Sequence, residues 1–117
     1  MVTLTGATDA SSSGWGGLIR NPGREVFRAG GDFPVDMAST HINLQEGYAL
    51  QQTLEMYCAD HSAQIAGSTL VSDIDNKAFH DSFKRGRAKN TLMHGMIVDL
   101  FWLQVEHDFI LKLRWVN

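Results

Sequence analysis

The sequence has few of the residues that stabilise secreted or metal-bound folds. It contains a single cysteine, Cys58, so no internal disulfide can form. No cysteine–histidine pair stands at the spacing of zinc ligands, which disfavours a zinc site. A serine nucleophile is also disfavoured, because the sequence has no G-x-S-x-G elbow. These absences exclude a disulfide scaffold and favour a reducing compartment.

Long apolar segments are absent as well. No run approaches the roughly 20 residues that a membrane span requires. The first ten residues, MVTLTGATDA, lack the basic region and apolar block of a secretory signal. We therefore expect an intracellular protein, in the cytoplasm or the nucleus, without a membrane partner.

Positive charge is scarce but concentrated. Ten Lys and Arg stand against thirteen Asp and Glu, for a net charge of −3, which argues against a protein that coats nucleic acid through bulk charge. Four of the ten basic residues fall within six positions: Lys84, Arg85, Arg87 and Lys89. On the residues alone, this basic loop is a solvated loop with helix-end charges. The length of 117 residues, of which 44% are hydrophobic, predicts a single globular domain over 1–117.

The first third of the chain predicts a strand meander. Short β-like runs occupy Leu4–Asp9, Trp15–Arg20 and Glu25–Gly30. The turn residues Asn-Pro-Gly-Arg at 21–24 separate the second run from the third, which indicates a hairpin. We expect these runs to form an antiparallel sheet.

The rest of the chain alternates helices and strands. The spacing predicts helices over 43–58, 76–84 and 91–107, the second with Gly86 as its C-cap, and strands over 67–75 and from 109 onward. Later strands reached through helices pair in parallel, so we predict an α/β fold with a five-stranded mixed sheet, three antiparallel strands and then two parallel additions. We place Trp15, Trp102 and Trp115 in its core.

Three acidic residues occupy informative places. Asp9 ends the first predicted strand, and Asp75 ends the fourth, which can be its central neighbour. Glu46 lies three positions after Asn43 and matches a capping box, and the residues alone favour this structural interpretation. A helix over the sheet could instead bring Glu46 to the two aspartates. Three carboxylates at one point repel each other, and a hard divalent cation such as Mg²⁺ or Mn²⁺ relieves the repulsion.

Several segments together resemble one family. TDASSSGWGGLI at 8–19, HINLQEGYAL at 41–50, DIDNKAF at 73–79 and LKLRWVN at 111–117 are similar to motifs of ribonuclease H domains. The wording is closest to the ribonuclease H domains of reverse transcriptases in DIRS-type and related retroelements. The resemblance covers nearly the whole chain, with its motifs in the family's order.

The resemblance implies a function and a site. It implies an endonuclease that hydrolyses the RNA strand of RNA–DNA hybrids with two Mg²⁺ (or Mn²⁺) ions, next to a reverse-transcriptase polymerase domain in a parent polyprotein. Asp9, Glu46 and Asp75 match the catalytic, metal-binding carboxylates. Asp75 is preferred over Asp73 because the family's Asp directly precedes the polar residue and the helix. The residues that would contact nucleic acid are Ser11, Ser12, Asn43, Lys84, Arg85, Arg87 and Lys89.

The sequence departs from the family at its last residue, Asn117. The family continues into a final helix with a fourth carboxylate, so we expect a C-terminally truncated domain without that helix. An alternative is therefore a catalytically inactive ribonuclease H-like domain that binds nucleic acid or serves as a connection domain. A partly uncovered sheet would also favour a homodimer.

Overall fold

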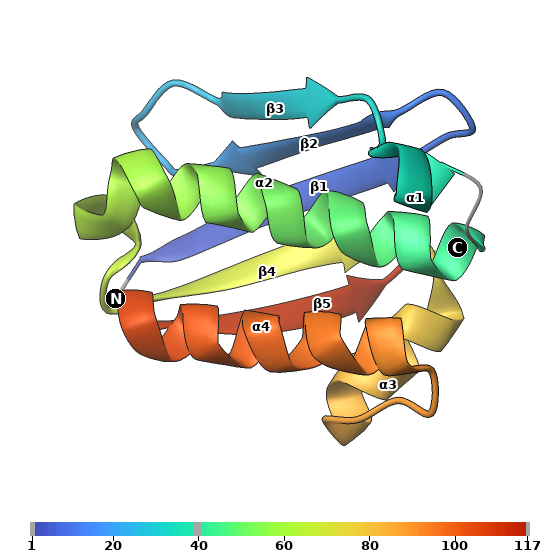
Figure 1. The fold of residues 1–117 in the computed structure, drawn as a ribbon. Helices are drawn as coiled ribbons and strands as arrows, with labels where there is room; N and C mark the ends of the chain where they lie inside the picture. Colours follow the sequence, from blue (N-terminus) through green and yellow to red (C-terminus); the bar gives the residue numbers. More distant parts are fainter. Residues whose placement is uncertain (1, 39–40, 117) are drawn as a thin grey trace.

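Five strands form one mixed sheet in the computed structural model, which describes residues 2–38 and 41–116 (Figure 1). The strands are β1 (Thr3–Ala10), β2 (Trp15–Arg20), β3 (Phe27–Gly31), β4 (Ser68–Ile74) and β5 (Phe109–Trp115). Their order across the sheet is β3-β2-β1-β4-β5. β1–β2 and β2–β3 pair antiparallel, whereas β1–β4 and β4–β5 pair in parallel. The predicted fold class is confirmed, including the central position of β1 beside β4.

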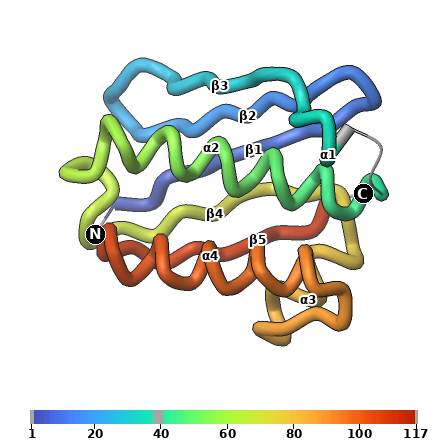
Figure 2. Tube along the Cα trace, in the orientation of Figure 1, coloured from blue at the N-terminus to red at the C-terminus, as the bar shows by residue number. Residues whose placement is uncertain are grey.

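The long helices lie side by side on one face of the sheet. They are α2 (Ile42–Ile65) and α4 (Thr91–His107), and both views show them running roughly along the direction of the strands (Figures 1 and 2). The short α1 (Val35–Ala38) precedes α2, and α3 (Lys77–Arg85) follows β4. No helix among the described residues is long and apolar enough to cross a membrane.

The core fills the space between this helical layer and the sheet. β4 alternates as a half-buried strand does, with its even-numbered residues, from Ser68 to Ile74, buried and its odd-numbered ones partly exposed. Leu4 of β1 and Leu70 of β4 are fully buried, and Leu50 and Leu54 of α2 are each 1% exposed. β5 alternates in the same way over its first residues, since Phe109 and Leu111 are buried and Ile110 between them is 53% exposed. The hydrophobic stripe of α2 therefore packs that helix mainly against β1 and β2.

Most predicted boundaries hold, and the exceptions have local causes. α3 begins after its N-cap Asn76 and ends at Gly86, whose φ of 80° is the left-handed conformation that favours glycine. α2 is longer than predicted and its N-cap is His41, whose side chain accepts a hydrogen bond from the Asn43 N–H, so Asn43 as N-cap is wrong. Placement of Trp102 and Trp115 in the core is also wrong, because they are 58% and 40% exposed.

Gly47 lets α2 lie close to its neighbours, and this close approach yields a prediction. A Cβ at Gly47 would overlap the Phe79 ring and lie 2.8 Å from the Met96 Sδ. We expect Gly47→Ala to lower the free energy of unfolding by about 1–3 kcal/mol, the usual cost of overpacking a core. Gly95→Ala in α4 is the control, because nothing lies within 4 Å of the added Cβ. Gly95→Ala should instead stabilise the protein by up to about 1 kcal/mol, because alanine favours the helix. Urea unfolding measures both variants, and equal effects at the two sites would contradict the packing argument.

Candidate metal centre

Three carboxylates from three different elements meet at one end of the sheet. One oxygen each of Asp9, Glu46 and Asp75 lies within 4.8 Å of the others. Asp9 and Asp75 are exposed, whereas Glu46 is 3% exposed. The cluster therefore has a buried floor and an open side that faces solvent.

The parallel pairing of β1 and β4 places the two aspartates. Ala7 pairs with Asp73 in the last pair of this ladder, so the residues two positions further on, Asp9 and Asp75, lie at the same level. The carboxyl ends of neighbouring parallel strands meet at one edge of the sheet. The Asp9 Oδ1 also accepts a hydrogen bond of 2.9 Å from the Ala10 N–H.

Glu46 reaches the aspartates from the first turns of α2. Because His41 caps this helix, Glu46 is its fifth residue rather than the third, and the capping-box interpretation of Glu46 is wrong. Its side chain points into the sheet edge and not back to the helix start, since its carboxylate joins the two aspartates. The shift of the cap by two residues thus removes the structural explanation for this acid.

The cluster is electrostatically strained without a cation. Burial is the main cause that raises the pKa of Glu46 to about 7, and the negative charges of Asp75 and Asp9 contribute to this rise. A hydrogen bond from the Ala10 backbone acts in the opposite direction and lowers the pKa. Among the described residues, none of the three acids has a basic ion-pair partner, and the buried Oε2 of Glu46 has no hydrogen-bond partner. A buried oxygen of this kind is costly unless something binds it.

These residues fit a hard divalent cation. All three potential ligand atoms are carboxylate oxygens. Mg²⁺ and Mn²⁺ prefer oxygen ligands, whereas zinc sites are built mainly from nitrogen and sulfur ligands. The Oε2 of Glu46 is buried and has no hydrogen-bond partner among the described residues, so this member of the cluster retains an unused acceptor. The exposed carboxylates leave room for water and substrate on the solvent side.

Asn76 and Trp115 make hydrogen bonds that fix the surroundings of Asp75, and neither role was predicted from the sequence. The Asn76 Nδ2 donates a hydrogen bond to the Asn43 Oδ1, which ties the start of α2 to the start of α3 directly beside Asp75. The Trp115 Nε1 on β5 donates to the Asp75 backbone carbonyl at 3.3 Å. The Asn76–Asn43 contact had a signal in the sequence, because a polar residue, Asn76, directly follows the strand-end Asp75. The second joins residues 40 positions apart and had no local signal.

Asp73 lies outside the cluster. Its Oδ1 accepts a hydrogen bond of 2.7 Å from the Arg114 Nε on β5, and the pair raises the pKa of Arg114. The choice of Asp75 over Asp73 as a cluster member agrees with this geometry.

The other sequence-predicted site residues fall into two groups. Ser11 and Ser12 are exposed in the turn directly after β1, where the Ser11 N–H donates to the Gly14 carbonyl at 2.8 Å. The basic loop lies at the end of α3 and in the α3–α4 connection, at the end of the sheet that carries the carboxylates (Figure 1). Its four members, Lys84, Arg85, Arg87 and Lys89, are exposed and have no ion-pair partner among the described residues.

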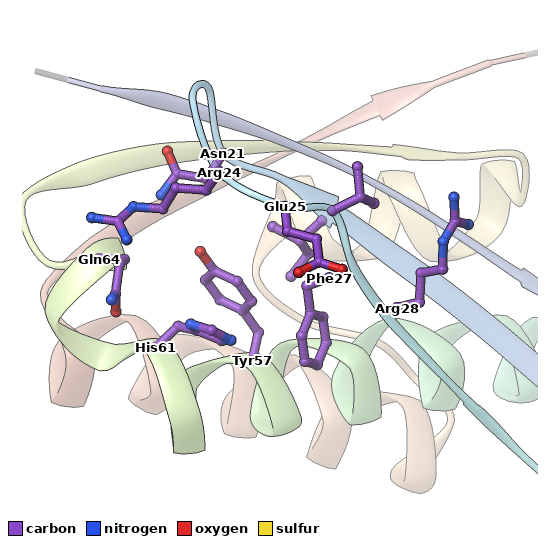
Figure 3. Close-up of a pocket in the computed structure, with 10 residues that line it drawn as sticks. Asn21, Arg24, Glu25, Phe27, Arg28, Tyr57, His61 and Gln64 are labelled. Carbon is purple, nitrogen blue, oxygen red and sulfur yellow. The ribbon is translucent and has the colours of Figure 1, made fainter.

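A cavity of about 380 Å³ lies at the opposite end of α2 and is separate from the carboxylates. Figure 3 shows Tyr57 and His61 side by side on α2, with Phe27 opposite them and Arg24 above. The Tyr57 and His61 rings stack with centroids 4.7 Å apart. Among the described residues that line the cavity, Glu25 is the only carboxylate, so the cavity does not resemble the metal centre.

Comparison with known proteins relates the chain to others through structure alone. No protein-family model and no curated protein sequence matches it. The compost-derived LC11 ribonuclease H1 in complex with an RNA/DNA hybrid is similar with a TM-score of 0.71 at 10% identity, covering 98% of this chain and 86% of that one. The ribonuclease H1 of Halobacterium salinarum gives 0.68 at 13%, covering 99% and 85%.

Two further structures extend the comparison. The N-terminal ribonuclease H domain of a Mycobacterium tuberculosis protein gives a TM-score of 0.71 at 14% identity, covering 99% of this chain and 86% of that one. A foamy viral protease-reverse transcriptase in complex with dsDNA gives 0.63 at 13%, covering 99% of this chain and 24% of that one. The coverage of nearly the whole chain, together with the strand order, shows that the chain has the ribonuclease H fold.

Proposed function

We propose that this chain is a ribonuclease H that hydrolyses the RNA strand of RNA–DNA hybrids with divalent metal ions. The observation that carries the proposal is the meeting of Asp9, Glu46 and Asp75, with the buried Glu46 Oε2 unpartnered among the described residues. The similarity to a ribonuclease H1 bound to an RNA/DNA hybrid supports this substrate. The similarity to a foamy viral protease-reverse transcriptase supports a polymerase domain as neighbour. Origin in a retroelement and an intracellular site of action are further parts of this proposal.

Asp9, Glu46 and Asp75 are the residues that would hold two Mg²⁺ or Mn²⁺ ions. Such ions supply Lewis acidity and a nucleophilic water at neutral pH for phosphodiester hydrolysis. The two exposed aspartates offer ligand oxygens on the solvent side, where the RNA strand would lie. Glu46 anchors the centre from the protein interior, and the Asn43–Asn76 hydrogen bond keeps its helix aligned with Asp75.

The hybrid would be held by groups on either side of the carboxylates. Ser11 and Ser12 are exposed hydroxyls directly after β1 and could contact the 2′-hydroxyls that distinguish RNA from DNA. Asn43 is partly buried and already paired with Asn76, so its proposed role is to position the site. The basic loop would contact the phosphate backbone without reading sequence.

The proposal is tested by cleavage of end-labelled substrates. We expect RNA–DNA hybrid to be cut in the RNA strand with Mg²⁺ or Mn²⁺ and not with EDTA. Double-stranded DNA and single-stranded RNA of the same sequence should stay intact. If no metal concentration gives cleavage, the proposal that this chain is an enzyme is wrong. The inactive alternative would then require hybrid binding that is unchanged by Asp9→Asn.

The basic loop yields a separate prediction on affinity. Replacing Lys84, Arg85, Arg87 and Lys89 by glutamine should weaken hybrid binding. It should also flatten the slope of log affinity against log salt, by up to about 0.9 for each phosphate that the loop neutralises in the wild type. Fluorescence anisotropy over a salt series measures both. Arg20→Gln, an exposed arginine on β2 that lies outside the loop, is the control. An unchanged slope would remove the loop from the interface.

A further inference from the structure

Helix α4 is apolar on the face that points away from the sheet as well as on the one that packs against it. Four residues are buried against the core: Met93, Met96, Ile97 and Leu100. Four others, here the outer stripe, are 37–58% exposed: Val98, Phe101, Trp102 and Val105. Their spacing of i, i+3, i+4 and i+7 aligns them along one line of the helix. Helices that are apolar all round are normally covered on both sides, and large exposed apolar patches mark interaction surfaces.

The side of the outer stripe next to α2 is acidic. The Gln51 Nε2 on α2 donates hydrogen bonds of 3.0 Å to both the Asp99 Oδ2 and the Glu55 Oε1, which places both carboxylates in the groove between the two helices. Glu106 lies seven residues after Asp99 and therefore on the same line of α4. We call Glu55, Asp99 and Glu106 the acidic flank.

The other side of the outer stripe is basic. A hollow of about 200 Å³ separates α4 from the end of α3 and is lined by Phe83, Gly86, Ile97, Val98, Phe101 and Gln104. Gly86 stands between Arg85 and Arg87, which are exposed and have no ion-pair partner among the described residues. We call these two arginines the basic flank. It lies level with Val98 and Phe101, and so with Asp99.

We infer that a second copy of this chain covers the outer stripe, with the two α4 helices parallel about a two-fold axis. In a parallel two-fold pair, each acidic flank faces the partner's basic flank, whereas an antiparallel pair brings like flanks together. The stripe thus carries apolar contact at its centre and complementary charge on its two sides. A nucleic acid or an anionic membrane is a poorer occupant of the outer stripe, because the acidic flank repels both. Arg85 and Arg87 also belong to the basic loop that is proposed to contact the hybrid, so this dimer would compete with the hybrid for these two arginines.

Sedimentation velocity tests the association. From about 1 µM to 1 mM, the range of weak to moderate affinities, we expect a concentration-dependent dimer. Trp102→Glu should weaken it by at least about 10-fold, since a charge would be buried at the centre of the stripe. Ile110→Glu is the control, because Ile110 is also an exposed apolar residue (53%) but lies on β5 and not on α4. A monomer throughout the range, or equal effects of both variants, would overturn the inference.

Cysteine cross-linking tests the orientation. Cys58 is 1% exposed and burial raises its pKa to about 12, so the native thiol does not compete. In a parallel pair, Val98→Cys should cross-link to itself and Val105→Cys to itself. Mixing the two variants should give few 98–105 cross-links. Cross-links found mainly between positions 98 and 105 would instead establish an antiparallel pair and overturn the charge argument.

Discussion

Asp9→Asn, Glu46→Gln and Asp75→Asn should each abolish cleavage of the RNA–DNA hybrid. Each change removes one carboxylate from a group whose oxygens lie within 4.8 Å of one another. Loss of an outer partner of a metal ligand commonly costs 10–100-fold in affinity or activity, and loss of a ligand itself should exceed about 100-fold. Initial rates under single-turnover conditions, with Mg²⁺ and separately with Mn²⁺, measure the effect.

Asp73→Asn is the matched control for these variants. Asp73 lies on the same strand end as Asp75 but pairs with Arg114 instead of the carboxylates. The Asp73→Asn variant should cleave the hybrid at a rate within a few-fold of the wild type, because an exposed ion pair contributes little to the stability of the fold. If Asp73→Asn is as inactive as Asp75→Asn, or if any of the three cluster variants stays fully active, the assignment of the metal centre is wrong.

The fold could be predicted from the sequence because its elements carry strong local signals. The strand from residue 109 onward and the end of α3 at Gly86 needed no tertiary information. The exposure of Trp102 could not be predicted in the same way. An aromatic residue on a strongly apolar helix is usually buried, and only the position of α4 relative to α2 and the sheet shows which side stays open.

The candidate site was predictable in part, and for a different reason. The positions of Asp9 and Asp75 at strand ends predict that they meet once β1 and β4 are neighbours. The place of Glu46 depends on where α2 begins. Asn43 and His41 are both able to cap a helix, and the local sequence favours Asn43. In the structure Asn43 instead pairs with Asn76 from another element, so His41 takes the cap. A tertiary contact therefore decides between the structural and the functional interpretation of Glu46.

Glu46→Gln should stabilise the metal-free protein although it destroys the proposed metal centre. The pKa of Glu46 is raised from 4.5 to about 7 in the folded state. Between these values the folded chain binds more protons than the unfolded chain, so the wild type loses stability as the pH rises through this window. Glutamine does not titrate. In EDTA, the advantage of Glu46→Gln should be small at pH 4, grow through pH 7 and then level off at about 3 kcal/mol.

Urea unfolding at a series of pH values measures this effect, with Glu25→Gln as the control. Glu25 is exposed and lies outside both the carboxylate cluster and the outer stripe, so this variant should change stability by less than about 0.5 kcal/mol at every pH. Adding Mn²⁺ should then stabilise the wild type and leave Glu46→Gln nearly unchanged, because ligand binding stabilises only the folded state that binds it. A stability difference that does not vary with pH would mean that Glu46 is not held in a strained, carboxylate-rich site. An equal response of both proteins to Mn²⁺ would mean that Glu46 is not a ligand.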